Sequence, residues 1–394
     1  MAGSFAVFHA LGIEKTFNVA ATVFFPKYLQ LLEIDEVPVD VTKHKVPGFL
    51  PCSTRCAKKL QKFHIQFRIF PCEHIIPEFS SVKPGDWDKK KGICNKKSKR
   101  YTENMEKHKE INESLIEEYH KSDVKYQDLY NKYGNKEINP PLKIEDLFKN
   151  INFHFINQHP LGIFDDFPKL DDKIMYFGGI IVEKQVKLTQ NKVKIDEPSC
   201  VVYVSFGSRK VSDISNIFGE QVIKQMITEF EKYDNCIFKA RLEEKFLPER
   251  TIDPSGFSTY KNIVFTEKST KQQNILSKTN TKLFISHCGL NGLNEAMYAG
   301  VPLICIPWGE DQPYNGSLTE HKGIGILVKH DENFEKAFKD ALNNILIKKN
   351  DDYQDAMTEM RAAVHNMLKH EKSPKEKFLE KILEVINSEN DEEG

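Results

Sequence analysis

Polar side chains and glycines gather at one junction of the chain, where an apolar run ends at Ser286 and a helical pattern begins. His287, Gly289, Asn291 and Gly292 occupy this junction. Glycine lets the backbone approach a phosphate closely, Asn291 can cap the helix, and His287 can donate a hydrogen bond to a phosphate oxygen. Because free N–H groups and the helix dipole attract anions at a helix N-terminus, the segment predicts a diphosphate site.

More polar residues follow at positions that suit a sugar and a ribose. Glu295 comes one helical turn after Asn291, so its carboxylate can accept hydrogen bonds from a ribose diol on the same helix face. The next apolar run ends at Pro307, and Asp311 and Gln312 then open another helix. A carboxylate beside an amide suits the hydroxyls of a hexose. Each residue taken alone has an ordinary structural interpretation, and only their shared order and spacing favours a ligand site.

The elements that must position these residues are those of a parallel sheet. From Cys200 onward, short apolar runs alternate with longer amphipathic ones, as in βα units, and strands buried on both faces are expected to be continuously apolar. The predicted strands are 200–206, 236–242, 262–266, 282–286, 301–306 and 325–328. The predicted helices are 214–233, 293–298, 334–347, 352–368 and 379–386. Ligands of such sheets bind beyond the carboxyl ends of the strands, where the polar junctions lie.

The first 180 residues carry a weaker version of the same pattern. Phe5–Ile13 predicts a buried helix and Lys15–Phe25 predicts a strand. The stretch from about 80 to 139 is rich in Lys, Glu, Asn and Tyr, which predicts solvated helices and loops. Its basic cluster, Lys89–Arg100, is more typical of a solvated face than of a phosphate site.

Composition excludes several classes of protein. The 394 residues suffice for two domains, and an apolar share of 40% with a net charge of −1 argues against a nucleic-acid or membrane-surface binder. No run is long enough to span a bilayer, and the N-terminus lacks the basic start and cleavage site of a secretory signal. The chain as written is therefore expected to be soluble.

The eight cysteines are scattered, several of them inside apolar runs, which favours buried free thiols over a disulfide framework. Cys52, Cys56, Cys72 and His74 can be arranged as a metal site, but their spacing matches no standard zinc pattern. No metal and no cofactor is expected.

The segment Leu283–Gly316 resembles the signature of the UDP-glycosyltransferase family, and specifically its animal glucuronosyltransferase type of invertebrate-like sequence. The matching positions run from Phe284 through His287, Gly289, Asn291, Gly292, Glu295 and Ala296 to Gly300, Val301, Pro302, Ile306, Pro307, Asp311, Gln312 and Asn315. Upstream, Val204–Ser208 is similar to the first strand and glycine turn of the family's donor domain, and Phe155–Pro160 with Phe177–Ile180 is similar to its interdomain approach.

The resemblance implies an α/β fold of two Rossmann-like, doubly wound domains that face a cleft, the B-type glycosyltransferase architecture. The first domain, 1–181, is expected to be an incomplete acceptor-side domain with a charged helical insert near 80–139. The second, 182–372, is expected to bind the donor, and 373–394 to form a C-terminal helix and acidic tail.

The resemblance also assigns roles to nine residues. It places the donor near Ser208, the ribose at Glu295 and Gln272, and the sugar at Asp311 and Gln312. It places the diphosphate at the polar junction, on His287, Gly289, Asn291 and Gly292.

The chain departs from the family at several places. Ser269 stands where the family usually has a tryptophan that stacks on uracil, which should weaken uracil binding by about 1–3 kcal/mol. Cys288 replaces a glycine, which matters only if that backbone needs a positive φ. The catalytic histidine and its aspartate partner have no counterpart, and His9 and Asp35 are not promoted to these roles. As written, the chain is also expected to lack the secretory signal and the membrane helix that place the family in the endoplasmic reticulum membrane.

Two functions remain open. The first is transfer of a hexosyl group, glucuronosyl or glucosyl, from a UDP-sugar co-substrate to a hydroxyl of a small lipophilic acceptor, with a histidine base. The second is a truncated or repurposed relative that binds the UDP-sugar without turnover. A nicotinamide dehydrogenase is excluded because SFGSRK is not the glycine-rich dinucleotide fingerprint. Acceptor identity, the choice of sugar and the oligomeric state are not specified by the sequence.

Overall fold

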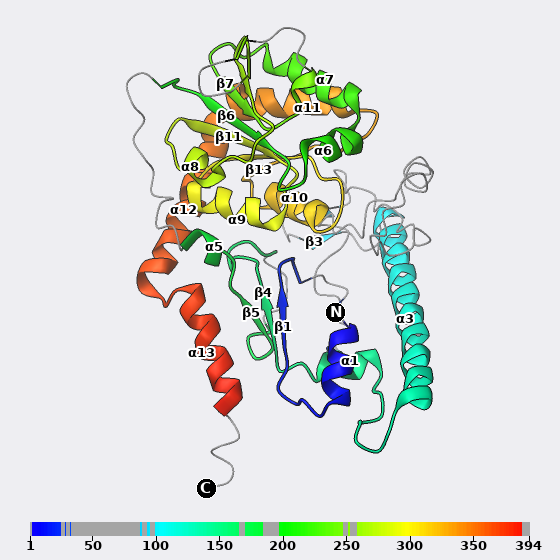
Figure 1. Ribbon diagram of the computed structural model, residues 1–394. Helices are drawn as coiled ribbons and strands as arrows, with labels where there is room; N and C mark the ends of the chain where they lie inside the picture. The colour runs from blue at the N-terminus through cyan, green and yellow to red at the C-terminus, as the bar shows by residue number, and fades with distance from the viewer. Residues whose placement is uncertain are drawn as a thin grey trace. The chain divides into compact units, whose positions relative to one another are not determined.

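The chain forms two compact units, each of which is an α/β structure built on a parallel sheet (Figure 1). The computed structural model describes residues 2–24, 28, 32, 87–88, 93–94, 99–164, 170–183, 197–246, 251–252 and 258–387. Unit 1 comprises Met1–Asn157, Phe164–Phe177 and Glu376–Gly394, and unit 2 comprises Gln158–Ile163 and Gly178–Lys375. The α/β class predicted from the sequence is confirmed. The boundaries at 181/182 and 372/373 stay predictions, because compactness alone does not measure independent folding.

Unit 1 contains a parallel sheet in the order β1-β4-β5, with strands β1 (Phe17–Ala20), β4 (Phe153–Ile156) and β5 (Ile174–Tyr176). Strand β4 is buried along its whole length, as expected for the middle strand. The helices among the described residues of this unit are α1 (Ala2–Ala10), α3 (Lys99–Tyr133), α4 (Ile144–Lys149) and α13 (Pro374–Asn387), whose first residues belong to unit 2. The short strands β2 (Trp87–Asp88) and β3 (Ile93–Cys94) form an antiparallel pair.

Two expectations for the N-terminal part meet different outcomes. The segment Phe5–Ile13 is helical as far as Ala10, but the helix is only partly buried, since Phe5 is covered while Val7 is 55% exposed. The prediction of a buried helix is therefore wrong for most of α1. The charged stretch is helical from Lys99 to Tyr133, and its described side chains are mostly exposed.

Unit 2 is built on an eight-stranded sheet in the order β13-β12-β11-β6-β7-β10-β9-β8. Strands β6 (Val201–Ser205), β7 (Ile237–Ala240), β10 (Ile263–Phe265), β11 (Thr281–Ser286), β12 (Leu303–Cys305) and β13 (Gly325–Leu327) are parallel to one another. Strands β9 (Ser258–Tyr260) and β8 (Thr251–Ile252) extend the edge antiparallel. In chain order the parallel strands follow the doubly wound pattern 3-2-1-4-5-6, so the order reverses between β6 and β11.

Helices cover both faces of this sheet, because its strands are apolar on both sides. On one face Val202 and Val204 pack into a core with α6 (Val211–Phe218), α7 (Glu220–Phe230) and α11 (Phe334–Asn343). On the other face Tyr203 stacks on Phe284 beneath α9. Figure 1 shows α7 and α11 on one side of the sheet and α9 (Leu290–Ala299) and α10 (Gln312–His321) on the other. The remaining elements of the unit are α5 (Ile180–Glu183), η3 (Glu244–Phe246), α8 (Gln272–Leu276), the π-helical turn η4 (Asn344–Lys348) and α12 (Asn350–His370).

One predicted helix of unit 2 is two helices. The apolar periodicity of 214–233 continues through Gly219, but the chain turns there with φ +80 and separates α6 from α7. Only glycine adopts such a φ without strain, so this residue allows the break. Periodicity alone did not indicate it.

Four cysteines form two disulfides, so the prediction of free thiols is wrong for them. Cys200 and Cys236 precede the paired strands β6 and β7, and their Cα atoms are 4.5 Å apart. Cys288 follows β11 and Cys305 ends the neighbouring strand β12, with Cα atoms 5.2 Å apart. Each pair joins adjacent strands, a closeness that depends on strand order and register and not on spacing along the chain.

Candidate nucleotide-sugar site

The predicted site residues lie where three neighbouring strands of unit 2 end at the same level. Ser205, the last residue of β6, is in register with Ser286, the last of β11, and Ser286 is in register with Cys305, the last of β12. The turns that follow these strands carry Ser208, His287 and the approach to Asp311. This edge includes the point where the strand order reverses, which is the usual ligand position in a doubly wound sheet.

The imidazole of His287 lies between two glycines. A Cβ on Gly207 would lie 2.8 Å from Cε1 of this ring, and a Cβ on Gly289 would lie 2.6 Å from its Nε2. Any other residue at either place would push the ring aside. The sequence assigned the glycines to phosphate approach, and the structure adds that they make room for the histidine.

His287 is uncharged near neutral pH. Burial, together with a smaller effect of the nearby charge of Arg209, lowers the pKa of the ring to about 4. Its Nδ1 lies 3.4 Å from Oγ of Ser286. A neutral imidazole carries one N–H, so with Nδ1 beside the serine hydroxyl, Nε2 can be the donor to a phosphate oxygen.

The backbone at Cys288 has a positive φ of 63°, the condition under which the replaced glycine matters. A non-glycine residue there is held by its surroundings. Its N–H donates to Oγ of Ser286, and its carbonyl accepts from Nδ2 of Asn315. Since the side chain of Cys288 is fully buried, these contacts fix the path of the chain from the strand to the next helix.

Helix α9 begins immediately after this turn. Gly289 is its N-cap, with φ −60 and ψ 147, and this residue has no side chain with which to cap the helix. The expectation that Asn291 caps the helix is therefore wrong, because this residue lies within the first turn and is exposed. Gly292 is buried against Phe284 and Ser286. The backbone N–H of Leu290, the first residue of the helix, donates to the carboxylate of Asp311. The dipole of the helix favours an anionic ligand at this end.

Glu295 and Gln272 lie together, as the predicted ribose site requires. The side-chain amide of Gln272, at the start of α8, donates to Oε2 of Glu295, and that of Gln273 donates to Oε1 over 2.7 Å. Burial raises the pKa of the Glu295 carboxyl, while these two hydrogen bonds act in the opposite direction. The sequence did not indicate Gln273. Ser269, the residue at the family's tryptophan position, is exposed just before α8.

Asp311 and Gln312 lie at the start of α10 and are both engaged by neighbouring groups. Nδ2 of Asn315 donates to Oδ2 of Asp311 over 3.0 Å, and the same nitrogen donates to the carbonyl of Cys288. Burial raises the pKa of Asp311, whereas hydrogen bonds from Asn315 and from the backbone of Asp311 and Leu290 lower it. Oε1 of Gln312 accepts the backbone N–H of Trp308. The hydrogen bonds of Asn315 thus connect the start of α10, the predicted sugar site, to the turn that carries His287.

The turn after β6 is held by a residue that the sequence analysis did not single out. Nη1 of Arg241, which directly follows β7, donates to the carbonyl of Gly207 over 2.7 Å and to that of Arg209 over 3.0 Å. Ser208 lies between these carbonyls and is exposed. The guanidinium of Arg209 lies 4.5 Å from the ring centroid of Trp308. A basic residue after the neighbouring strand is the only sequence signal that marks Arg241.

The described residues contain no identified catalytic base. His9 lies in unit 1, where its Nε2 is 3.0 Å from the carbonyl oxygen of Pro140. His64, His74 and Asp35 lie outside the described residues, as do Cys52, Cys56 and Cys72 of the metal alternative. Within the described part of the chain no group of three or more His, Cys, Asp or Glu could hold a metal ion. Among the described helices none has the length and apolar content to cross a membrane.

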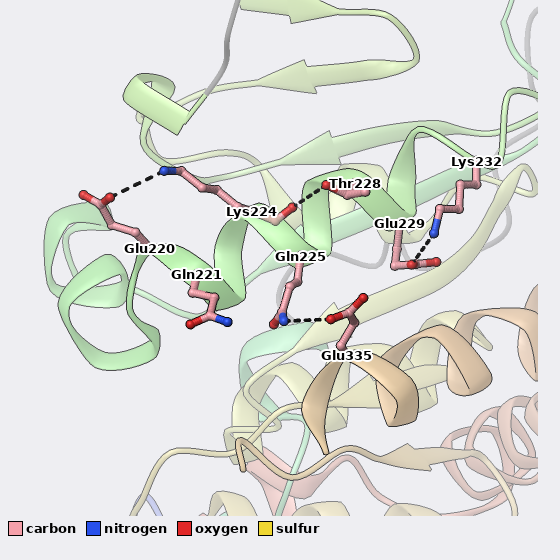
Figure 2. Close-up of a pocket in the computed structure, with 8 residues that line it drawn as sticks. All are labelled: Glu220, Gln221, Lys224, Gln225, Thr228, Glu229, Lys232 and Glu335. Atoms are coloured by element: carbon pink, nitrogen blue, oxygen red, sulfur yellow. Dashed lines mark hydrogen bonds and ion pairs between the residues drawn. The ribbon is translucent and has the colours of Figure 1, made fainter. Parts of the chain in front are cut away.

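A polar surface groove lies between α7 and α11 and contains none of the predicted site residues (Figure 2). Its charged side chains have polar partners within the groove. Lys224 lies 3.7 Å from Glu220, Lys232 pairs with Glu229, and Gln225 donates to Glu335. Because these side chains already have partners, we do not assign a ligand to the groove, and its residues serve as control positions for the binding experiments below.

Comparison with protein-family models decides the family. The model described as UDP-glucoronosyl and UDP-glucosyl transferase matches residues 46–366, most of the chain. The chain belongs to the UDP-glycosyltransferase family. This match includes every residue of the site in unit 2, so the resemblance seen in the motif extends through the domain that carries it.

Curated relatives are similar over part of their length. The Caenorhabditis elegans protein ugt-50, provisionally named a UDP-glucuronosyltransferase, is 28% identical over 210 residues, which are 52% of this chain and 38% of that protein. The ecdysteroid UDP-glucosyltransferase of Autographa californica nuclear polyhedrosis virus is 25% identical over 229 residues, 57% of this chain and 42% of that one. The chain therefore spans about two fifths of the length of these relatives.

Among solved structures, the glycotransferase of kitacinnamycin is similar with a TM-score of 0.47 and 14% identity, over 73% of this chain and 63% of that one. A UDP-glucose:anthocyanidin 3-O-glucosyltransferase in complex with UDP is similar with a TM-score of 0.45 and 19% identity, over 62% of this chain and 57% of that one.

Proposed function

We propose that unit 2 binds a UDP-sugar along the edge formed by the turns after β6, β11 and β12. The observation that carries the proposal is the joint placement on α9 of Glu295, held by two glutamine amides, and of the helix N-terminus, where the N-cap is a glycine. The ribose of a UDP-sugar is linked directly to the diphosphate. A carboxylate one to two turns beyond the start of a helix can therefore bind the ribose while the diphosphate lies at the helix N-terminus. Asp311 and Gln312 then lie next along the chain for the hexose hydroxyls.

The reaction that we propose is transfer of a hexosyl group, glucuronosyl or glucosyl, from the UDP-sugar to a hydroxyl of a small lipophilic acceptor. Membership of the UDP-glycosyltransferase family supports this reaction. The similarity to a nematode protein supports placing the chain with the invertebrate glucuronosyltransferase type. The transfer needs a base that removes the acceptor proton, and no residue is assigned to that role.

The donor half of the proposal is tested by titrating the full chain with UDP and with ADP in a calorimeter. We expect binding of UDP that His287→Ala weakens, because the ring loses its N–H donor to the diphosphate. The exposed groove residue Lys224 supplies a control, since Lys224→Ala changes a side chain remote from the predicted contacts. Equal affinity of wild type and His287→Ala for UDP would refute the assigned site.

The transfer half is tested separately. The chain is incubated with UDP-glucuronic acid or UDP-glucose and a panel of phenols and alcohols, and glycosides are detected by mass spectrometry. Multiple turnovers support the transferase. Binding of UDP without any glycoside would support the alternative function, a protein that holds the UDP-sugar without turnover.

A further inference from the structure

Three side chains from different turns stack on one another at the edge of the site. The guanidinium of Arg209 lies 4.5 Å from the ring centroid of Trp308. The other ring partner of Trp308 is His287, whose ring centroid is 6.3 Å away with an interplanar angle of 15°. Arg209 follows β6, His287 follows β11 and Trp308 follows β12, so the stack connects all three turns that form the site.

Arg209 is held in place at both ends. Its backbone carbonyl accepts a hydrogen bond from Arg241, and its guanidinium lies against the indole face. A guanidinium over an aromatic face keeps its N–H groups at the rim of the plane, where they can meet a ligand. Within the described part of the chain, no carboxylate forms an ion pair with Arg209, and the residue is exposed.

The position of Arg209 favours the sugar over the diphosphate. The diphosphate already has the N-terminus of α9 and the neutral ring of His287. Trp308, the ring on which Arg209 lies, is linked instead to the predicted sugar site, because its backbone N–H donates to Oε1 of Gln312 over 3.0 Å. An anion next to the hexose hydroxyls is therefore the group that an arginine at this place can reach.

The shape of the guanidinium indicates which anion. Arginine presents paired N–H groups in one plane, which match the two oxygens of a carboxylate. A hexose that carries a carboxylate is a hexuronic acid, in which C6 is oxidised. A neutral hexose has a hydroxyl there and cannot form the same charged pair.

We propose that Arg209, supported by Trp308, binds the C6 carboxylate of the donor sugar and makes a UDP-hexuronate the preferred donor. The inference rests on the proposed binding of a UDP-sugar by unit 2. It adds a residue that selects the sugar, and it predicts a preference between the two hexosyl donors that the family model names together.

The test measures the affinity of the full chain for UDP, UDP-glucose and UDP-glucuronic acid by calorimetry. Wild type is expected to bind UDP-glucuronic acid about tenfold more tightly than UDP-glucose. In Arg209→Gln this ratio is expected to fall to about one, with the loss confined to UDP-glucuronic acid. Trp308→Leu, which keeps the backbone N–H but removes the platform, should reduce the ratio in the same direction. Lys224→Gln removes one positive charge from the α7 groove and should leave the ratio unchanged.

The outcomes separate the two proposals. If wild type binds none of the three ligands, the proposed UDP-sugar site is refuted, and so is the selection of the sugar by Arg209. If UDP binds but Arg209→Gln weakens all three ligands equally, the arginine serves the diphosphate and the inference is overturned. A wild-type ratio near one that Arg209→Gln does not change also overturns it.

Discussion

Replacing Glu295 by alanine tests the ribose contact on which the proposed donor site depends. The carboxylate accepts hydrogen bonds from Gln272 and Gln273, which hold it in one orientation before any ligand arrives. A hydrogen bond to a charged group contributes about 1.5–3 kcal/mol. Because the carboxylate is partly buried and already oriented, we expect a loss of about 2–3 kcal/mol, which is about 30- to 150-fold in the Kd for UDP.

The assay for Glu295→Ala is calorimetric titration with UDP at pH 7.5, beside the matched control Glu220→Ala. Glu220 is an exposed carboxylate of α7 that pairs with Lys224, remote from the predicted contacts, so its removal should leave the Kd unchanged. Glu295→Gln retains an acceptor oxygen without the charge and should lose less than the alanine variant. Should Glu295→Ala bind UDP within twofold of wild type, the ribose assignment would be wrong.

A pH series with uridine extends this test, because uridine has no phosphate that titrates. Ribose hydroxyls donate to the ionised carboxylate, so binding favours the charged form of Glu295. Burial raises the pKa of this carboxyl. Affinity for uridine is therefore expected to fall as the pH falls through the raised pKa, and the fall should be absent in Glu295→Gln.

Three more substitutions have defined outcomes. Gly289→Ala should weaken UDP binding, because the added Cβ would lie 2.6 Å from Nε2 of His287. Gly309→Ala is the control, since a Cβ there would meet no atom within 4 Å and should leave UDP binding unchanged. Equal calorimetric affinities of the two variants would contradict the steric argument. Thermal stability should fall as the pH falls from 6.5 to 4. Burial, with a smaller effect of nearby positive charges, lowers the pKa of His154 and of His287 to about 4, so both rings take up protons on unfolding in this range. His154→Gln should flatten this fall in a series of melting curves, and an unchanged slope would exclude the buried ring as a cause. Ser269→Trp should tighten uridine binding by about 1–3 kcal/mol if this exposed position faces uracil, and no gain would show that it does not.

The strands of unit 2 were predictable because each is a short apolar run buried on both faces. Strand β11 was predicted at 282–286 and is observed at Thr281–Ser286, and the predicted polar junction follows it directly. The pairing of Gln272 with Glu295 came from resemblance to the family, and the structure brings these side chains together. Local pattern was sufficient wherever a residue's position depends on where its own strand ends.

Features that depend on contacts between distant segments could not be predicted in this way. Arg209 and Trp308 are far apart in the chain and meet only because β6 and β12 flank β11. The two disulfides have the same origin, since each joins residues of neighbouring strands. The break between α6 and α7 at Gly219 could not be predicted for a different reason. The apolar periodicity is the same on both sides of it, and only the backbone angle reveals the turn.

The contacts around Asn315 imply that the segments proposed to hold the diphosphate and the sugar move together. This buried amide donates to the carbonyl of Cys288 and to the carboxylate of Asp311, so it ties the turn after β11 to the start of α10. A ligand phosphate that shifts the turn at Cys288 must either break one of these hydrogen bonds or move Asp311 with it. Because an unpaired buried polar group is costly, joint movement is favoured, and binding of the diphosphate would then help to position Asp311, the group proposed to hold the sugar.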